Sequence, residues 1–159
     1  MPRVIVILGS SKDEKFIEPL YKIFDNFQIK YNTRIASAHK TPNKVLEILK
    51  EYKKDRPVYI TVAGKSDALS GMVDANTISP VIACPPYSEK FGGADIYSSL
   101  RTPRGVAPLV ILEPENAALA AVKILALENP SLQEKIVEYQ TKKKQKIDDE
   151  DKLMKEGAI

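Results

Sequence analysis

Short runs of apolar, largely β-branched residues alternate with segments of helical periodicity along most of the chain. The first run, "RVIVIL" over residues 3–8, is continuous rather than alternating, which is typical of a strand buried on both faces. Similar runs occur at 31–36, 58–63, 80–84 and 106–112. Strands separated by helices predict βαβ units with right-handed crossovers. We therefore expect an α/β fold: a three-layer, doubly wound parallel sheet of flavodoxin-like or Rossmann-like type.

The helical segments carry apolar stripes and start signals. The first stripe consists of Phe16, Ile17, Leu20, Ile23, Phe24 and Phe27. Ser11 and Glu14 before it fit a capping box, S-x-x-E. Thr41 and Pro42 resemble the N-cap and first position of a second helix, 42–53. Its predicted inner face consists of Val45, Leu46, Leu49 and Tyr52. A short helix is expected after "GKSDALSG", and an alanine-rich helix over 115–127.

The length of 159 residues predicts one domain, 1–159, with a distinct C-terminal segment. Residues 130–159 are helix-prone and highly charged, with few apolar positions. One interpretation is a solvated helix whose last ten residues or so are frayed. The other is a helical arm that packs on neighbouring subunits.

The composition and charge of the chain exclude several classes of function. A net charge of +3 favours neither a nucleic-acid nor a membrane surface as partner. The sequence has no apolar run long enough for a bilayer and no signal-peptide pattern, so we expect a cytoplasmic protein. A single cysteine and a single histidine exclude a Cys/His zinc cluster within one chain, and no close set of acids follows a strand to hold magnesium. Cys84 is interpreted as a buried strand residue rather than a nucleophile.

The polar loops all follow predicted strands directly. They are "GSSKD", "SAHKTP", "AGKSDALSG" and "CPPYSEKFGGAD". In an open parallel sheet such turns share one edge, where ligands bind. His39, the only histidine, therefore lies at the predicted functional edge. Ser37 and Lys40 beside it suit a phosphate, and an imidazole there can exchange protons near neutral pH.

Other interpretations of these loops stay open at this level. "GSSKD" matches neither dinucleotide-binding nor Walker patterns, and helix capping by Ser10 or Ser11 explains it equally well. Asp13 could favour the helix dipole or bind ribose hydroxyls. The third and fourth loops could close over a small ligand or simply connect strand to helix. Serine–histidine nucleophilic chemistry is disfavoured because no G-x-S-x-G elbow is present.

Taken in order, these turns resemble the PurE family of purine biosynthesis. "ILGSSKD" is similar to the family's G-S-x-S-D turn, "SAHKTP" to its S-A-H-[RK] turn, and "AGKSDALSGMV" to its third turn. The likeness spans roughly residues 3 to 140. It favours class II, the direct carboxylases of aminoimidazole ribonucleotide (AIR), whose third turn reads A-G-R-S-N-[AG]-L. "ISPVIACPP" and "ADIYSSLRTPRG" also resemble class II. Class I mutases have a second histidine in the third turn.

The resemblance implies that CO2 carboxylates AIR reversibly to 4-carboxy-AIR (CAIR), without ATP, biotin, metal or another cofactor. His39 would be the general acid and base at C4 of the imidazole. Ser10 and Asp13 would bind the ribotide, with Asp13 on the ribose hydroxyls, while Ser37 and Lys40 would bind the 5′-phosphate. The pocket for CO2 and the carboxylate would be formed by Gly64, Lys65, Ser66, Asp67 and Ala68. The family also implies a homo-octamer, with a tetramer as the alternative, and active sites at subunit contacts.

Three positions depart from the family pattern. Lys12 replaces the second serine of the first turn, Lys65 replaces an arginine, and Asp67 replaces an asparagine. Asp67 would add a negative charge beside the expected carboxylate. The alternatives to the direct carboxylase are a class I-type mutase of N5-carboxy-AIR, a carboxylase of a different nucleotide, and a non-catalytic nucleotide-binding relative.

Overall fold

The computed structural model describes residues 3–157, and in this part of the chain five parallel strands form one sheet. The strands are β1 (Val4–Leu8), β2 (Tyr31–Ile35), β3 (Val58–Val62), β4 (Val81–Ala83) and β5 (Leu109–Val110). Their order across the sheet is β2-β1-β3-β4-β5, the doubly wound order of flavodoxin-like folds. The predicted α/β fold class is confirmed.

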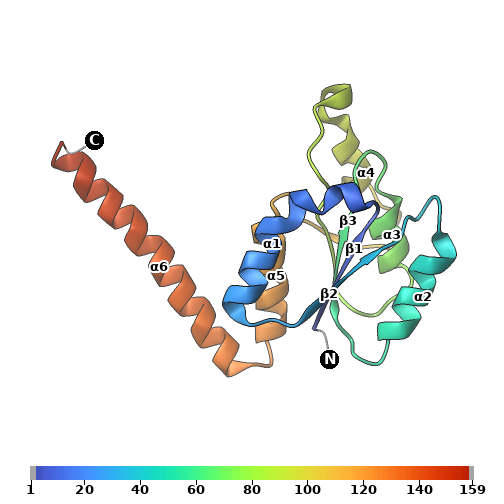
Figure 1. The fold of residues 1–159 in the computed structure, drawn as a ribbon, viewed down its shortest axis with the longest axis horizontal. Helices are drawn as coiled ribbons and strands as arrows, with labels where there is room; N and C mark the ends of the chain where they lie inside the picture. Colours follow the sequence, from blue (N-terminus) through green and yellow to red (C-terminus); the bar gives the residue numbers. More distant parts are fainter. Residues whose placement is uncertain (1–2, 158–159) are drawn as a thin grey trace.

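Helices cover both faces of the sheet (Figure 1). One face carries α1 (Glu18–Phe27) and α5 (Pro114–Ala126), and the other carries α2 (Pro42–Tyr52) and α3 (Ala68–Asp74). The remaining elements are α4 (Tyr97–Leu100), α6 (Pro130–Lys155) and the 3-10 turns η1 (Ser11–Asp13), η2 (Lys15–Ile17) and η3 (Lys90–Ile96). The two helical layers make the central strands inaccessible to solvent on both sides.

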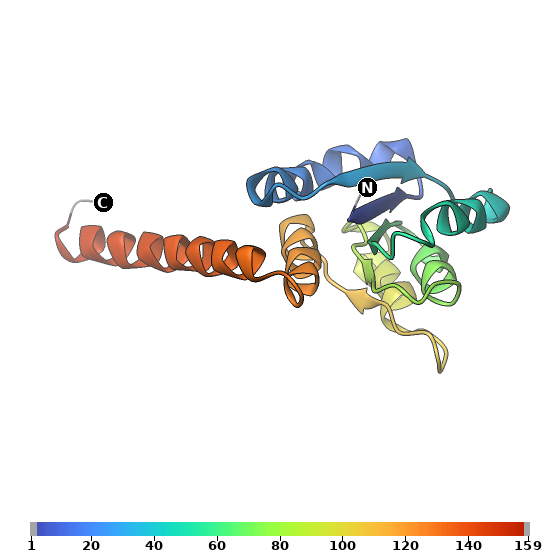
Figure 2. The same cartoon turned by 90° about the horizontal axis from the view of Figure 1, so that it is seen from below.

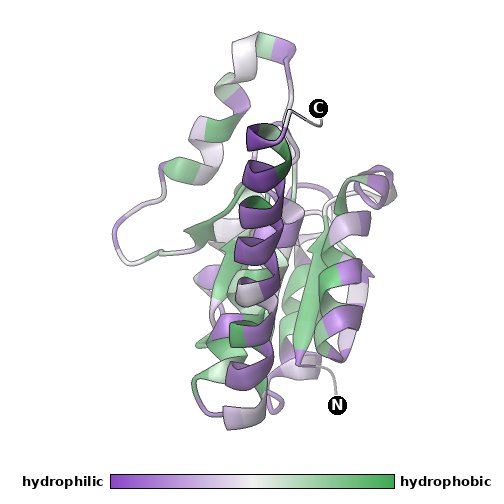
Figure 3. Ribbon diagram, turned by 90° about the vertical axis from the view of Figure 1, so that its left-hand side faces the viewer, coloured by the Kyte–Doolittle hydropathy of each residue, from purple (hydrophilic) through white to green (hydrophobic). Residues whose placement is uncertain are grey.

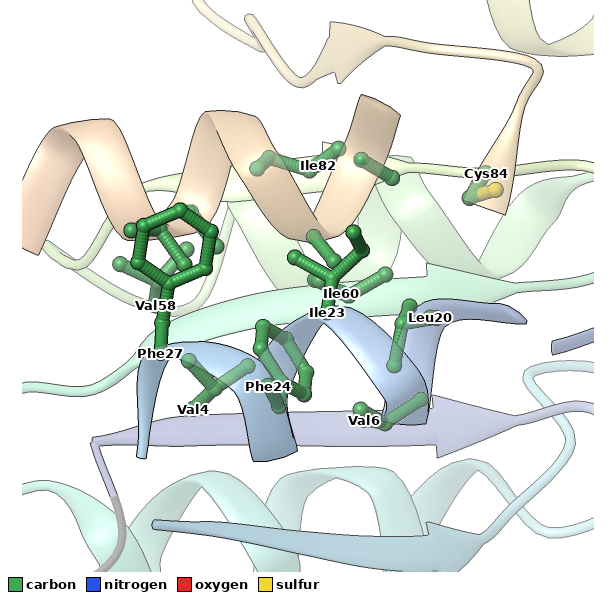
Figure 4. Packing of buried hydrophobic residues seen from close by; sticks show 14 of the residues in the cluster. Val4, Val6, Leu20, Ile23, Phe24, Phe27, Val58, Ile60, Ile82 and Cys84 are labelled. Atoms are coloured by element: carbon green, nitrogen blue, oxygen red, sulfur yellow. The ribbon is translucent and has the colours of Figure 1, made fainter. Parts of the chain in front are cut away.

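The position of β1 inside the sheet, between β2 and β3, explains why its sequence is apolar throughout. Val4, Val6 and Leu8 point into the core beneath α1 and α5, while Ile5 and Ile7 point into the core beneath α2 and α3. All five residues are buried. In the first of these cores, aromatic and aliphatic side chains of α1 pack over the strands (Figure 4). Two separate cores therefore hold the sheet between its helices.

Two of three helix predictions need correction. The capping box does not form: the Ser10 side chain caps η1, and α1 begins only at Glu18, where Pro19 can occupy the first turn. On α2, Ile48 rather than Leu46 joins the buried face, and Leu46 is 41% exposed. The third is confirmed: Thr41 is the N-cap of α2 and Pro42 its first residue, although the Thr41 side chain makes no cap hydrogen bond to the helix.

The last predicted strand is much shorter than expected. Of residues 106–112, only Leu109 and Val110 pair with β4. This strand lies at the sheet edge, and Pro108 just before it has no N–H to donate to a ladder. Edge position and proline together explain why an apolar run gives two paired residues here.

The C-terminal segment is a single long helix that leaves the body of the domain (Figures 1 and 2). Leu132 and Ile136 anchor its first turns in the core, and the Tyr139 ring packs against Phe27 at a tilt of 55°, with ring centroids 5.4 Å apart. Beyond these anchors the helix is mostly hydrophilic (Figure 3), with i,i+4 ion pairs such as Lys155–Asp151. It remains helical to Lys155, which lies within the last ten residues where the sequence favoured a frayed end, and residues 156–157 form a turn.

Two leucines on α2 provide a matched test of how this helix packs against the sheet. Leu49 is 6% exposed and Leu46 is 41% exposed on the same helix. We expect Leu49→Ala to lower the free energy of unfolding by about 2–5 kcal/mol, because it leaves a cavity. Leu46→Ala should cost less than about 1 kcal/mol. Urea denaturation followed by circular dichroism measures both, and equal losses would contradict the assigned helix face.

Candidate active site

The turns after β1, β2 and β3 meet in a cleft of about 620 Å³ at the carboxyl edge of the sheet. Because β1 pairs in register with both neighbours, these three strands end at the same level. The cleft is lined by Gly9, Ser10, Lys12, Asp13, Ser37, Ala38, His39, Lys40, Ala63, Gly64, Lys65, Ser66 and Leu69. The structure thus brings the only imidazole of the chain together with hydroxyls, lysines and one carboxylate.

The first turn is packed tightly against the third. The Gly9 N–H donates to the Val62 carbonyl at 2.8 Å, which continues the β1–β3 ladder beyond Leu8. A Cβ on Gly9 would lie 3.4 Å from the Ala63 Cβ, so glycine permits this close approach. Next to it, the Ser10 hydroxyl accepts from the Lys12 N–H at 3.3 Å. The bond fixes the short η1 turn that carries Lys12 and Asp13 into the cleft.

The second turn is closed by Thr41. Its hydroxyl accepts from the Ser37 N–H at 2.9 Å, and its own N–H donates to the Ser37 carbonyl at 2.8 Å. The Ser37 hydroxyl accepts from the Lys40 N–H at 3.2 Å. Both His39 and Lys40 are exposed at the tip of this turn. The Thr41 hydroxyl is therefore engaged within the turn, which explains why the Thr41 side chain makes no capping hydrogen bond to α2.

The third turn contains a residue in an unusual backbone conformation. Lys65 has φ 64°, in the left-handed region that non-glycine residues rarely occupy. Such conformations persist where the surroundings hold them, and they gather at functional sites. The Lys65 and Ser66 side chains are exposed at the cleft. Asp67 is different: it is buried, and its carboxylate accepts hydrogen bonds from the protein instead of facing the cleft.

The charges of the cleft favour an anion. Lys12, Lys40 and Lys65 line it, and Asp13 is the one carboxylate in its lining. Burial raises the pKa of the Asp13 carboxyl, an effect that the Ser10 backbone partly offsets. With Asp67 turned away, three cations face one acid. A phosphate group would be electrostatically favoured in such a concave site.

A second, smaller cavity of about 120 Å³ adjoins the cleft. Both share Ala63, Gly64 and Lys65 as lining residues. The rest of its wall comes mainly from the fourth turn and includes Pro85, Pro86, Tyr87 and Ile96. Most of this lining is apolar, so the small cavity suits an uncharged group better than an ion.

Several other features bear on the chemistry. Cys84 is fully buried directly after β4, and desolvation raises the pKa of its thiol to about 12. It is therefore protonated near neutral pH and unsuited to nucleophilic attack. Within residues 3–157, no cluster of three or more His, Cys, Asp and Glu side chains could hold a metal ion. No helix in the same range is long and apolar enough to cross a membrane.

Most of the predicted site residues do come together. Eight of them line the cleft: Ser10, Asp13, Ser37, His39, Lys40, Gly64, Lys65 and Ser66. Asp67 and Ala68 lie outside its lining, at the start of α3. Lining residues that the sequence did not assign to binding are Gly9, Lys12, Ala38, Ala63 and Leu69. All five are chain neighbours of assigned residues, and Leu69 reaches the cleft from the first turn of α3.

Comparison with known proteins identifies the family. The family model described as AIR carboxylase matches residues 3–146. A phosphoribosylaminoimidazole carboxylase from Archaeoglobus fulgidus is 55% identical over 145 residues, 91% of this chain and 81% of the relative. An N5-carboxyaminoimidazole ribonucleotide mutase from Methanocaldococcus jannaschii is 39% identical, over 96% of this chain and 98% of the relative.

The fold agrees with that family. The crystal structure of PurE from Treponema denticola superposes with a TM-score of 0.92 at 47% identity, covering 96% of this chain and 98% of that one. The sequence likeness and the structural likeness span the same strands, turns and helices. This chain therefore belongs to the AIR carboxylase family, the PurE family of purine biosynthesis.

Proposed function

We propose that this protein carboxylates AIR directly with CO2 and releases CAIR, as a class II member of its family. The observation that carries the proposal is the position of His39: the only imidazole of the chain lies in the cleft, between the turns that supply lysines and hydroxyls. The third turn, where class I members have a second histidine, has "AGKSDALSG" instead. A single proton carrier is sufficient for the direct reaction.

The ribotide occupies the larger cleft in this proposal. Lys40 and Ser37 hold the 5′-phosphate, with Lys12 as a further cation nearby. Asp13 and Ser10 bind the ribose side, where the carboxylate accepts from the ribose hydroxyls. The excess of lysines over acids in the lining supports a phosphate-bearing substrate.

The chemistry needs only a proton acceptor at one carbon. The exocyclic amine makes the imidazole ring of AIR an enamine, and the electron pair at C4 attacks the carbon of CO2. A carbon–carbon bond forms while one C=O π pair moves onto oxygen as a carboxylate. C4, now tetrahedral, loses its proton to His39, and the ring regains aromaticity. In the reverse direction His39 returns the proton to C4, and CO2 leaves.

The small apolar cavity supports CO2 itself as the second substrate. CO2 is neutral and small, and the cavity of about 120 Å³ meets the cleft at Gly64 and Lys65. Lys65 and Ser66 then stabilise the carboxylate as its charge develops. Because CO2 is already an electrophile, this reaction uses neither ATP nor biotin.

The mutase is the second candidate. It would transfer a carboxyl group from N5 to C4 of the same ribotide, and the 39% identical relative named as such a mutase favours it. A carboxylase of another nucleotide, or a nucleotide-binding protein without activity, are the remaining alternatives. Among these, only the binding protein has no use for the His39 imidazole.

We also propose that the protein is a homo-octamer, with a tetramer as the alternative, in which α6 packs on neighbouring subunits. Along α6, Val137, Ile147 and Met154 are each more than 60% exposed. Tyr87 and Phe91 of the fourth turn, near the small cavity, are also highly exposed. Apolar side chains presented in this way are suited to burial between subunits.

The first test offers purified protein each ribotide separately, in an ultraviolet assay without ATP. We expect prompt carboxylation of AIR by CO2 supplied from bicarbonate. N5-carboxy-AIR should be consumed no faster than it decays spontaneously. Rapid conversion of the N5-carboxy compound alone would identify a mutase. No reaction with either compound would favour a different nucleotide or the non-catalytic alternative.

His39→Asn tests the proton carrier. We expect turnover to be lost, while the dissociation constant of the ribotide stays within about tenfold, or about 1.4 kcal/mol. Lys40→Ala is the counterpart: it should weaken ribotide binding because a phosphate contact is lost. Isothermal titration gives the binding constants and the ultraviolet assay gives the rates. Substantial activity of His39→Asn would disprove this mechanism.

Removal of residues 142–159 tests the arm. The truncated chain keeps Leu132, Ile136 and Tyr139, which anchor α6, so it should fold with a cooperative thermal transition. We expect its mass in light scattering to fall below that of the full-length oligomer, because contacts to neighbouring subunits are removed. An unchanged oligomer would show that this part of the arm is merely solvated.

A further inference from the structure

Asp67 makes more side-chain hydrogen bonds within the protein than its position in a surface turn would require. Its Oδ1 accepts from the Ser70 N–H at 3.0 Å, which caps α3. Its Oδ2 accepts from two hydroxyls, Ser70 Oγ and Ser99 Oγ, each at 2.8 Å. Asp67 is 6% exposed, Ser70 is fully buried and Ser99 is 2% exposed. One buried carboxylate therefore connects the start of α3 with α4, although Asp67 and Ser99 lie 32 residues apart in the chain.

The backbone of the third turn takes part in the same connection through Ser98. The Asp67 N–H donates to the Ser98 Oγ at 2.9 Å. The Ser98 hydroxyl donates to the Asp95 carbonyl at 2.7 Å, and the Lys65 carbonyl lies 3.4 Å from the same oxygen. The side chain of Asp67 and the backbone on both sides of Ser66 are thus held against α4.

The third turn, held by these bonds, lines both cavities. Lys65 lines both, together with Ala63 and Gly64, and Asp95 lines the small cavity. Lys65 is also the residue with φ 64°, a backbone conformation that needs support from its surroundings. The Asp67 hydrogen bonds lie directly C-terminal to that strained position. Without them, the third turn would be free to relax toward a more ordinary conformation.

We propose that Asp67 is a positioning residue, which locks the third turn to α4 and so fixes Lys65 and the shape of the small cavity. This inference rests on the proposed function, because it gives that cavity to CO2. An asparagine can make the same connections: its carbonyl accepts from the Ser70 N–H, and its amide donates to a serine hydroxyl that rotates to accept. The geometry therefore requires a side chain of this shape, not a negative charge.

The central test is Asp67→Ala, assayed for CO2 and the ribotide separately. We expect the KM for CO2 to rise by about tenfold or more, because the turn that forms its cavity is released. The dissociation constant of the ribotide should change by less than about threefold, since the first and second turns hold it. A merely structural role would reduce the amount of folded enzyme, and with it the apparent kcat, but would leave both constants unchanged.

Three further variants distinguish the effect of the Asp67 hydrogen bonds to α4 from a general loss of stability. Asp67→Asn should restore the KM for CO2 to within about threefold of wild type. Ser99→Ala keeps the α3 cap but removes the bond from the Asp67 side chain to α4, and it should raise that KM as well. It carries the test if Asp67→Ala does not fold. Asp74→Ala is the matched control. It removes an acid of α3 that accepts from the Ala107 N–H at 2.7 Å, away from both cavities, and should leave the KM for CO2 unchanged.

A readout without turnover distinguishes this proposal from the proposed function. Hydrogen exchange should show faster exchange of the Asp67 amide, whose N–H is bonded to Ser98, in Ser99→Ala but not in Asp74→Ala. That result supports the positioning role even if the wild type proves unable to carboxylate AIR. Unchanged exchange together with an unchanged KM for CO2 in Asp67→Ala and Ser99→Ala would overturn it. So would an Asp67→Asn variant as impaired as Asp67→Ala.

Discussion

The parallel pairing of β1 with both β2 and β3 is the constraint on which the rest of the structure depends. Leu8, Ile35 and Val62 are register partners at the ends of these strands, so the three turns that follow begin at one level. The ladder continues past the strands through the bonds from Gly9 to Val62 and from Ala36 to Leu8. Residues far apart in the chain therefore meet in one cleft without long loops. A slip of one residue in this pairing would exchange the two core faces of a strand and move its turn away from the others.

The same pairing gives the strands and the turns different roles: the strands form the core, and the turns form the cleft. Strand residues are buried beneath helices on both faces, so they take no part in the chemistry. Even Cys84, directly after β4, is buried with its thiol protonated. Polar and conformationally unusual residues gather in the turns, where Gly9 allows close packing and Lys65 adopts a left-handed conformation. The rigid sheet holds these turns in place, and a few side-chain bonds, such as those of Thr41 to Ser37, set their local shape. The cleft is therefore preorganised by groups that need not touch a ligand.

Much of this could be predicted because the signals are local. Continuous β-branched runs indicate strands buried on both faces, and the placement of His39 after one of them followed from the topology of parallel sheets. Signals that depend on tertiary context were less informative. Ser11 and Glu14 have capping-box spacing, yet the chain uses 3-10 turns there and begins α1 at Glu18, directly before Pro19. Likewise, the choice between Leu46 and Ile48 on α2 depends on how the helix is rotated against the sheet, which two similar aliphatic residues do not specify.

Asp67 shows that the effect of a charged residue also depends on tertiary contacts that the local sequence does not reveal. In the sequence it is an acid inside a turn expected to hold a carboxylate, and repulsion was the natural expectation. That expectation assumes that the side chain faces the ligand, and residue identity says nothing about direction. The partner hydroxyls of α4 lie 31 and 32 residues further along, so no local pattern could reveal them. In the folded chain, the Asp67 carboxylate accepts hydrogen bonds from three donors and is directed away from the cleft. A carboxylate in place of the family's amide is therefore compatible with a cleft that binds anions.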